Sequence, residues 1–389
     1  MTGLPAGALE GLRVADLAGP YGNYCGKLYA DLGADVVLVE PPEGAESRRR
    51  QPFTAEGESL WFCYHNANKR GVIAEPGSAA LAAVIRGSDV VIGSGAAGWP
   101  SAWGIDLGAL RREQPRLVVV SVTPFGLSGP YADFDGTDIV CLALGGLLAL
   151  GGYGDGAPLR AAGEQALQSA QLFAAVGGAM AVLNAEATGD GQLVDVSAQE
   201  SVAMALEHAI QYYDLEGITR GRQTGRQRGA GAGLYTCADG WVYLFVGGIA
   251  SGRFWQRFVD WLRDEKAEGA AELSDPAWGE RKYFDSAEAK ETFLRIFETF
   301  TATRKREDLY HGAQSRGIPL APVREPSEVV ASEQLRLHEF FRPVATPDGH
   351  SILAPGAPYT LAETPWLQRR PAPRLGEHTA EILAGIQHG

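Results

Sequence analysis

The chain has 389 residues, 45% of them hydrophobic and 21% charged, and a formal net charge of −13. The composition is ordinary for a globular protein, and the length suits two domains or one large domain with an insertion. The negative charge, with no basic run to offset it, disfavours nucleic acid and anionic membranes as partners. No run of 18 apolar residues and no secretion signal is found, so we expect a cytoplasmic protein without a membrane span.

The four cysteines, at positions 25, 63, 141 and 237, are far apart and lack metal-binding spacing. They indicate reduced, packed thiols. The sequence therefore predicts no metal site.

The first unit of structure spans residues 12–41. Leu12–Leu17 is expected to be a short buried strand, a helix follows a Gly/Pro turn, and Ala34–Glu40 is a second, nearly all-apolar strand. Strand, helix and strand in about thirty residues make one βαβ unit, and its apolar strands suit a parallel sheet covered on both faces. Glu40 could bind a ribose, as in dinucleotide folds, or be a solvated strand end. The nearby glycines do not form GxGxxG, so the ligand stays open.

The alternation of strands and helices continues beyond this unit. Further strands are predicted at 88–92, 116–122 and 192–196, and helices at 78–86, 167–187 and 201–213. This pattern predicts an α/β fold with a doubly wound parallel sheet. Gly177 and Gly178 lie inside the longest helix, where each costs about 1 kcal/mol, so close packing of another backbone is the expected reason for them.

Composition divides the chain into four segments. Residues 1–215 form the first part of a large domain, 216–234 a Gly/Arg-rich linker, 235–320 a smaller inserted α/β domain, and 321–389 a return to the large domain. The small domain is expected to open with a hairpin at Tyr235–Val246, turning at Asp239-Gly240. Arg48-Arg49-Arg50 is the one compact basic triplet, and it is either a solvated turn or a phosphate site.

Eight blocks in order resemble CoA-transferase family III, the group containing formyl-CoA transferase, carnitine CoA-transferase and α-methylacyl-CoA racemase. They cover almost the whole chain and include LEGLRVADLAGP, NANKRGV, SDVVIGSG, PRLVVVSVTPFGLSGP, TGDGQLVDVSAQE, YTCADGWVYL, GIPLAPV and PAPRLGEHTAEIL. The resemblance implies a two-domain subunit whose large domain uses both termini, and a homodimer of two interlocked rings. Family members move CoA from a thioester to a carboxylic acid.

In this family an aspartate at the start of the long helix attacks the thioester, giving a mixed anhydride and then an aspartyl-CoA thioester. Counting back from Thr188-Gly189 places that aspartate at Leu167, which cannot be a nucleophile. Glu164, three residues earlier, could replace it if the helix start is shifted, or it could be a helix N-terminal acid favoured by the dipole. In the racemase branch a histidine precedes an aspartate; here Thr137 precedes Asp138, which could be catalytic or structural. His65 could face the cleft or be a packing residue.

The resemblance also names candidate CoA contacts. The loop after the first strand, at Ala18, lacks the family's His and Gln, and a Lys and an Arg of the family fall on Thr123 and Ala102. Lys69 and Arg70 are retained and could hold a phosphate or carboxylate, or only cap a turn. The family's glycine-rich lid over the active site corresponds to residues 229–233, so Gly229, Gly231 and Gly233 are candidate cofactor contacts; the alternative is a linker.

Three functions follow from these departures. The first is a divergent family III CoA-transferase-like enzyme acting on a small carboxylic acid or acyl-thioester, with CoA or acyl-CoA as its co-substrate. The second is a repurposed scaffold that catalyses a CoA-independent acid/base step, such as cyclisation, isomerisation or elimination, in a biosynthetic pathway. The third is a non-catalytic subunit that pairs with an active homologue, in place of the expected homodimer.

Overall fold

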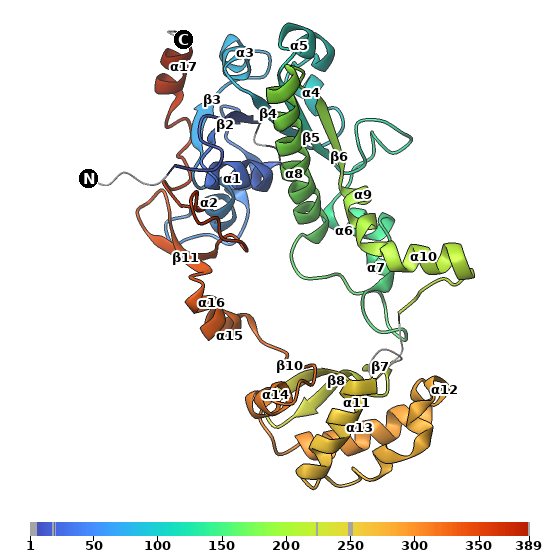
Figure 1. The fold of residues 1–389 in the computed structure, drawn as a ribbon. Coiled ribbons are helices and arrows are strands. Elements are labelled where there is room, and N and C mark those ends of the chain that lie inside the picture. Colours follow the sequence, from blue (N-terminus) through green and yellow to red (C-terminus); the bar gives the residue numbers. More distant parts are fainter. Residues whose placement is uncertain (1–5, 18, 20, 223–224, 248–251, 388–389) are drawn as a thin grey trace. The chain divides into compact units, whose positions relative to one another are not determined.

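The computed structural model describes residues 6–17, 19, 21–222, 225–247 and 252–387, and the chain divides into two compact units (Figure 1). Unit 1 comprises residues 1–149, 160–219 and 333–389, and unit 2 comprises residues 150–159 and 220–332. Unit 2 is therefore an insertion, and unit 1 uses both ends of the chain. The main boundaries fall at 219/220 and 332/333. Most of the segment 216–234, predicted as a linker, therefore belongs to unit 2, which also extends beyond the predicted end at 320.

Unit 1 contains a six-stranded parallel sheet in the order β3-β2-β1-β4-β5-β6. The strands are β1 Arg13–Asp16, β2 Asp35–Glu40, β3 Arg70–Ile73, β4 Val90–Ser94, β5 Val118–Thr123 and β6 Leu193–Ser197. This is the order of doubly wound dinucleotide-binding sheets, so the predicted fold class is confirmed. The five predicted strands are present. The edge strand β3 was missed because RGVI is short and begins with a charge.

Both faces of this sheet are buried, which explains the continuous apolar strands. Val14, Val36 and Val90 belong to one core cluster, whereas their neighbours Ala15, Val37 and Val91 belong to the cluster on the opposite face. Successive side chains of a strand point to opposite faces. A strand covered on both faces therefore needs apolar residues at successive positions, as in Val36–Val39.

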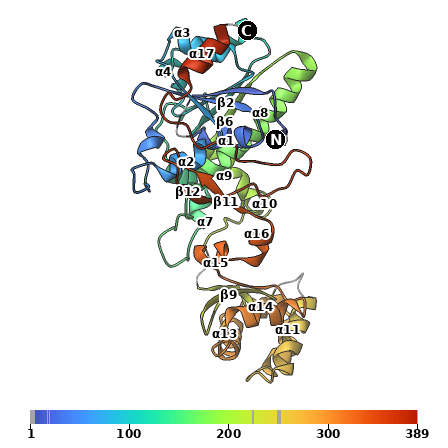
Figure 2. The ribbon, with the colours of Figure 1, turned by 90° about the vertical axis from the view of Figure 1, so that its left-hand side faces the viewer.

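Two groups of helices cover the two faces. The first cluster contains residues of α1, α6, α8 and α9, and the second contains residues of α3 and α17 together with Trp99 of α4. Figure 2 shows α17, from the end of the chain, beside α3. The helices are α1 Asn23–Asp31, η1 Glu46–Arg49, α2 Leu60–Asn66, α3 Ala79–Arg86, α4 Trp99–Ala102, α5 Leu107–Glu113, α6 Asp138–Leu144, α7 Leu147–Leu150, α8 Gln165–Thr188, α9 Ala198–Ala203, η2 Met204–Leu206, α10 Glu207–Glu216, α16 Glu333–Leu337 and α17 Thr379–Gln387; a small hairpin, β11 Phe341–Ala345 and β12 Ser351–Pro355, completes the unit.

The longest helix, α8, packs closely on the sheet through Gly178. A Cβ at this position would lie 2.4 Å from the Tyr29 hydroxyl and 2.9 Å from Cγ2 of Val120. The expectation of another backbone at the glycine pair is therefore wrong: side chains are the neighbours, Val194 at Gly177 and Tyr29 and Val120 at Gly178. Among the described helices, α8 is also long and apolar enough to cross a bilayer by length and composition alone, a test that core helices can pass.

Unit 2 is a four-stranded antiparallel sheet, ordered β10-β9-β8-β7, with an aromatic core. Its strands are β7 Gln227–Gly229, β8 Ala232–Cys237, β9 Gly240–Phe245 and β10 Leu320–Pro322, and its helices are α11 Gly252–Asp264, η4 Glu272–Ser274, η5 Pro276–Gly279, α12 Arg281–Phe284, α13 Ala287–Thr301, α14 Arg306–Gln314 and α15 Pro326–Val330. The predicted hairpin is confirmed as β8 and β9, joined at Asp239.

The segment predicted as a glycine-rich lid is a packed hairpin in this structure. Gly229 ends β7, Ala230 is fully buried, and Gly231 makes the turn with φ +74°. A Cβ on Gly233 would lie 2.3 Å from the carbonyl oxygen of Arg226. The small residues therefore allow close backbone approach, whereas the sequence interpretation had taken them as freedom to move.

Candidate functional site

Three sequence-predicted positions lie together at the first turn of α8. Glu164 is the N-cap residue, and Leu167 is the third residue of the helix. Asp138, the first residue of α6, reaches this turn from another part of the chain. We take this end of α8, in unit 1, as the candidate active site.

Asp138 caps α8 from outside the helix. Its Oδ1 accepts hydrogen bonds from the backbone N–H groups of Ala166, at 2.9 Å, and Leu167, at 3.3 Å. These are two of the N–H groups that a helix leaves without an internal partner. Burial raises the pKa of Asp138, and the two hydrogen bonds oppose that shift. Its other oxygen, Oδ2, is buried and has no hydrogen-bond partner among the described residues.

The side chain at the predicted nucleophile position is apolar and packed. Leu167 is 5% exposed and belongs to the core cluster shared with Cys141 and Ala170. Burial in this cluster leaves the leucine in contact with hydrocarbon rather than with a polar cleft. Leu167 therefore has no group that could attack a thioester, as expected from the sequence, and its side chain is also buried.

Glu164 and His65 are linked through Arg50 and Trp61, a contact that the sequence did not predict. Glu164 forms an ion pair with Nη2 of Arg50. The Arg50 guanidinium carbon lies 4.4 Å from the centre of a Trp61 ring, and Trp61 stacks on His65 with ring centres 3.8 Å apart. The structure thus gathers the predicted residues Asp138, Glu164 and His65 around one region of unit 1.

His65 is held as a neutral packing residue. Its Nδ1 lies 2.9 Å from the carbonyl oxygen of Trp61, so this nitrogen carries the proton, and Tyr24 and Tyr64 meet the ring with their edges. Burial lowers the pKa of His65 to about 3. The imidazole is therefore uncharged near neutral pH, and Nε2 is buried without a hydrogen-bond partner among the described residues.

Lys69 lies in the interior and forms the centre of a polar network. It is 0% exposed, and its Nζ donates to Oδ2 of Asp16 at 2.7 Å, the carbonyl oxygen of Asn23 at 2.8 Å and Oδ1 of Asn66 at 2.8 Å. An ammonium has three N–H donors, so none is left for a phosphate. Burial lowers the pKa of Lys69, and Asp16 opposes this shift.

The other expected cofactor contacts do not assemble a CoA site. Arg70 binds both carboxylate oxygens of Asp35, at 2.9 and 2.6 Å, and also Glu381 at 2.8 Å. Ala18 lies outside the described residues. Glu40, considered for a ribose, is buried and paired with Arg48 at 2.6 Å. Lys69 and Arg70 are therefore bound to carboxylates of the protein itself, and we assign neither of them a role in binding CoA.

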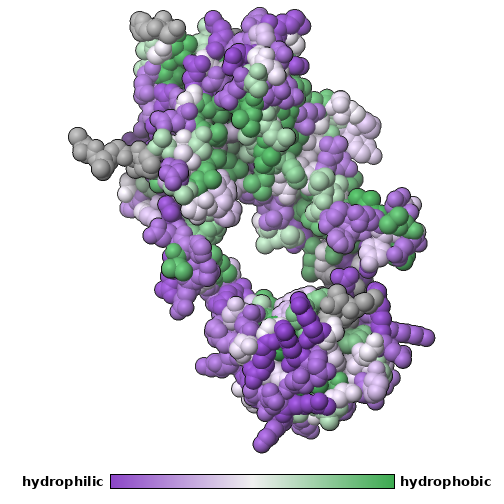
Figure 3. Space-filling model, viewed as in Figure 1, coloured by the Kyte–Doolittle hydropathy of each residue, from purple (hydrophilic) through white to green (hydrophobic). Residues whose placement is uncertain are grey.

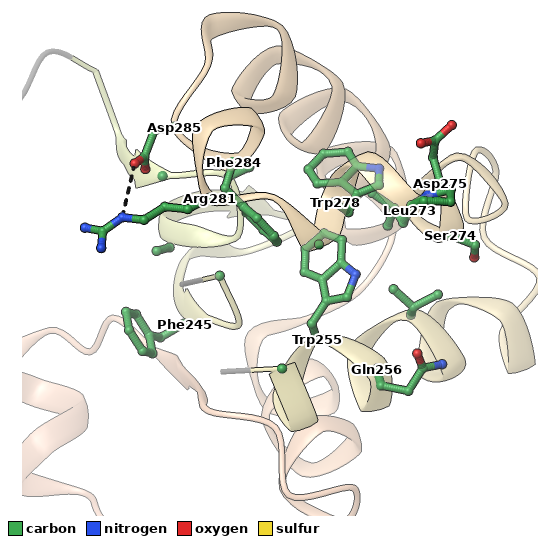
Figure 4. Close-up of a pocket in the computed structure, with 18 of the residues that line it drawn as sticks. Phe245, Trp255, Gln256, Leu273, Ser274, Asp275, Trp278, Arg281, Phe284 and Asp285 are labelled. Carbon is green, nitrogen blue, oxygen red and sulfur yellow. Dashed lines mark ion pairs between the residues drawn. The ribbon is translucent and has the colours of Figure 1, made fainter. Parts of the chain in front are cut away.

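Unit 2 has a separate pocket of about 710 Å³, shown in Figure 4. Trp255 and Trp278 stack in it with ring centres 5.0 Å apart, and Phe284 meets Trp255 edge-on at 4.8 Å. Arg281 and Asp285 form an ion pair across 3.8 Å at its rim. Gly229 lines this pocket.

One group of potential metal ligands was not apparent from the sequence. Glu56, Asp348 and His350 each bring a ligand atom within 4.8 Å of the others. Asp348 also accepts a hydrogen bond from Thr346, and His350 pairs with Glu56 at 3.2 Å. These contacts explain why the three side chains lie together without a bound ion. The absence of a metal site stays a prediction.

We expect Lys69→Met to lower the free energy of unfolding by about 3–5 kcal/mol, because it leaves the Asp16 carboxylate buried without its cation. Urea unfolding monitored by circular dichroism would measure the change. Arg70→Met is the matched control: its ion pairs are partly exposed, so the loss should be about 1 kcal/mol or less. Equal losses for the two variants would contradict this account of the network.

We expect Asp138→Asn to gain stability relative to the natural protein as pH rises above about 4. A raised carboxyl pKa means that the folded state binds more protons, so stability falls with rising pH between the unfolded and the folded pKa. The amide removes this loss and keeps an oxygen for the α8 cap. Urea unfolding at several pH values between 4 and 7 tests the trend. Asp106→Asn is the control, because the pKa of that exposed cap is lowered and its pH effect lies below about 4. A difference that does not change with pH would contradict the prediction.

Comparison with known proteins agrees over the whole chain. Residues 9–379 match the family model described as CoA-transferase family III. The subunit BbsE of succinyl-CoA:(R)-benzylsuccinate CoA-transferase from Thauera aromatica is 40% identical over 381 residues, 95% of this chain and 92% of that protein. Succinate–glutarate CoA-transferase of Agrobacterium fabrum is 29% identical over 398 residues, 97% and 96% of the two chains.

Solved structures agree with the fold. The crystal structure of a CAIB/BAIF family protein from Brucella suis superimposes with a TM-score of 0.83 at 25% identity, over 98% of this chain and 100% of that one. Together with the parallel sheet and the inserted unit, these matches confirm the resemblance drawn from the sequence blocks. The chain belongs to CoA-transferase family III.

Proposed function

We propose that this chain is one subunit of a two-chain CoA-transferase for a small carboxylic acid, and that its partner is a homologue carrying the nucleophilic aspartate. The coarser part, a family III CoA-transferase-like activity on small acids, is supported by the family match and by the named relatives. These relatives use CoA thioesters as substrates. The division of labour between two chains is the new element.

The observation that carries the proposal is the first turn of α8. Leu167 is apolar and 5% exposed. Asp138 has one oxygen bound to two backbone N–H groups of α8, and the Glu164 carboxylate is paired with Arg50. A carboxylate must be exposed and unshielded to attack a thioester. At this turn Leu167 offers no carboxylate and Asp138 caps the helix, which favours a nucleophile supplied by another chain.

Two further observations support a partner chain. The relative at 40% identity is itself named a subunit. Helix α8 also presents exposed apolar side chains, namely Leu172, Phe173, Val176, Met180 and Leu183. Figure 3 shows green, apolar surface in the region of this helix. Contiguous exposed apolar surface of this kind marks protein–protein contact sites. A homologous large unit, with its own α8, is the occupant that we propose.

The test is to express this chain with a family III homologue from the same source that has aspartate at the position of Leu167. We expect a complex of the two chains, transfer of CoA from succinyl-CoA to a small acid by the complex, and little transfer by either chain alone. Mass spectrometry of the trapped intermediate should place the CoA adduct on the partner's aspartate. Glu164→Gln in this chain should leave the adduct unchanged.

Two results would overturn the proposal. One is a CoA adduct on Glu164 of this chain, lost in Glu164→Gln, because it would make the chain a self-sufficient enzyme. The other is full transfer activity by this chain alone. Size measurement on the same sample separates a homodimer from a complex of unlike chains.

A further inference from the structure

We propose that Arg50, held against Trp61 beside the first turn of α8, is a binding site for the carboxylate of a small organic acid, and that Glu164 occupies this site when no ligand is bound. The argument concerns this chain alone. It does not require the partner proposed above.

Arg50 differs from the other two members of the basic triplet. Arg48 donates to both carboxylate oxygens of Glu40, which is fully buried, so it is committed to the fold. Arg49 is exposed and donates to the carbonyl oxygen of Glu43, at 3.4 Å. Arg50 is held in place and still accessible: its guanidinium rests 4.4 Å from a Trp61 ring centre, and its side chain is 31% exposed.

The aromatic contact fixes the orientation of the guanidinium. Trp61 is itself immobilised by the stack on His65. A cation over an aromatic face is attracted by the ring quadrupole, and the planar guanidinium binds carboxylates directionally. Arg50 is therefore prepared to receive a carboxylate before any ligand arrives.

Glu164 shows which group fits, and it is replaceable. Its carboxylate is seated on Arg50, with a side chain 29% exposed. It makes no capping hydrogen bond to α8, although it holds the N-cap position, because Asp138 provides the cap. Partly exposed ion pairs contribute little to stability. Glu164 can leave Arg50 without loss of the helix end.

A ligand carboxylate would find the same charges that Glu164 finds. The end of the 24-residue helix α8 carries partial positive charge that favours an anion. Asp138 Oδ2, buried at the same turn and without a partner among the described residues, is an acceptor for a hydroxyl donor. Because the resident group is a planar carboxylate, we assign a carboxylate, rather than a phosphate, as the ligand class.

Calorimetric titration of the purified chain with succinate, acetate and inorganic phosphate tests the assignment. Glu164→Gln removes the internal competitor, so succinate should bind about threefold to fivefold more tightly than to the natural chain. Arg50→Gln should weaken binding by at least about tenfold, since it removes a charged hydrogen-bond donor. In the double variant the gain from Glu164→Gln should disappear, because both changes act on the same contact.

Arg49→Gln is the matched control and should leave the affinity unchanged, since that side chain lies on the exposed side of the triplet. Urea unfolding of each variant checks that it is folded. The proposal is wrong if the Glu164→Gln variant binds neither succinate nor acetate at about 10 mM. It is also wrong if the gain from Glu164→Gln persists in the variant that lacks Arg50, or if phosphate binds more tightly than both acids. Each of these results is independent of whether a partner chain or CoA transfer is found.

Discussion

The buried ammonium of Lys69 is the interaction on which the large unit depends most. It joins Asp16 at the end of β1, the first residue of α1 and the last residue of α2 through three hydrogen bonds. Helix α1 must come close for this to happen, and a Cβ on Gly26 would lie 2.3 Å from the Asp16 carboxylate. A buried charge without such partners would cost several kcal/mol. The network therefore fixes how α1 and α2 sit at the carboxyl ends of the strands.

The placement of α2 has a consequence for the candidate site. Trp61 and His65 lie one helical turn apart on α2 and stack on each other, and Arg50 rests against Trp61. The guanidinium is thereby held near the end of α8, where it meets Glu164. The buried Lys69 ammonium, whose three donors are all used within the fold, thus positions α2, and α2 in turn holds the accessible Arg50 guanidinium through Trp61.

At the first turn of α8, capping of the helix N–H groups and pairing with Arg50 are performed by two different carboxylates. Asp138, on α6, accepts hydrogen bonds from two backbone N–H groups of α8. Glu164 is therefore not needed as a cap and can pair with Arg50. Leu167 completes the turn by packing into the core. The fold of a family III subunit is kept, and under the proposed function the nucleophile comes from the partner chain.

The sequence by itself determined the fold class, the family, five of the six strands of the parallel sheet and the long helix, because apolar periodicity and motif order are local properties. Tertiary structure decided what the charged residues do. Lys69, expected at a cofactor, is fully buried beside Asp16, a residue distant in sequence. Residues 229–233, expected in a lid, pack as a hairpin. The pairing of Arg50 with Glu164 joins residues that only folding brings together, since the burial and partners of a charge depend on the whole chain.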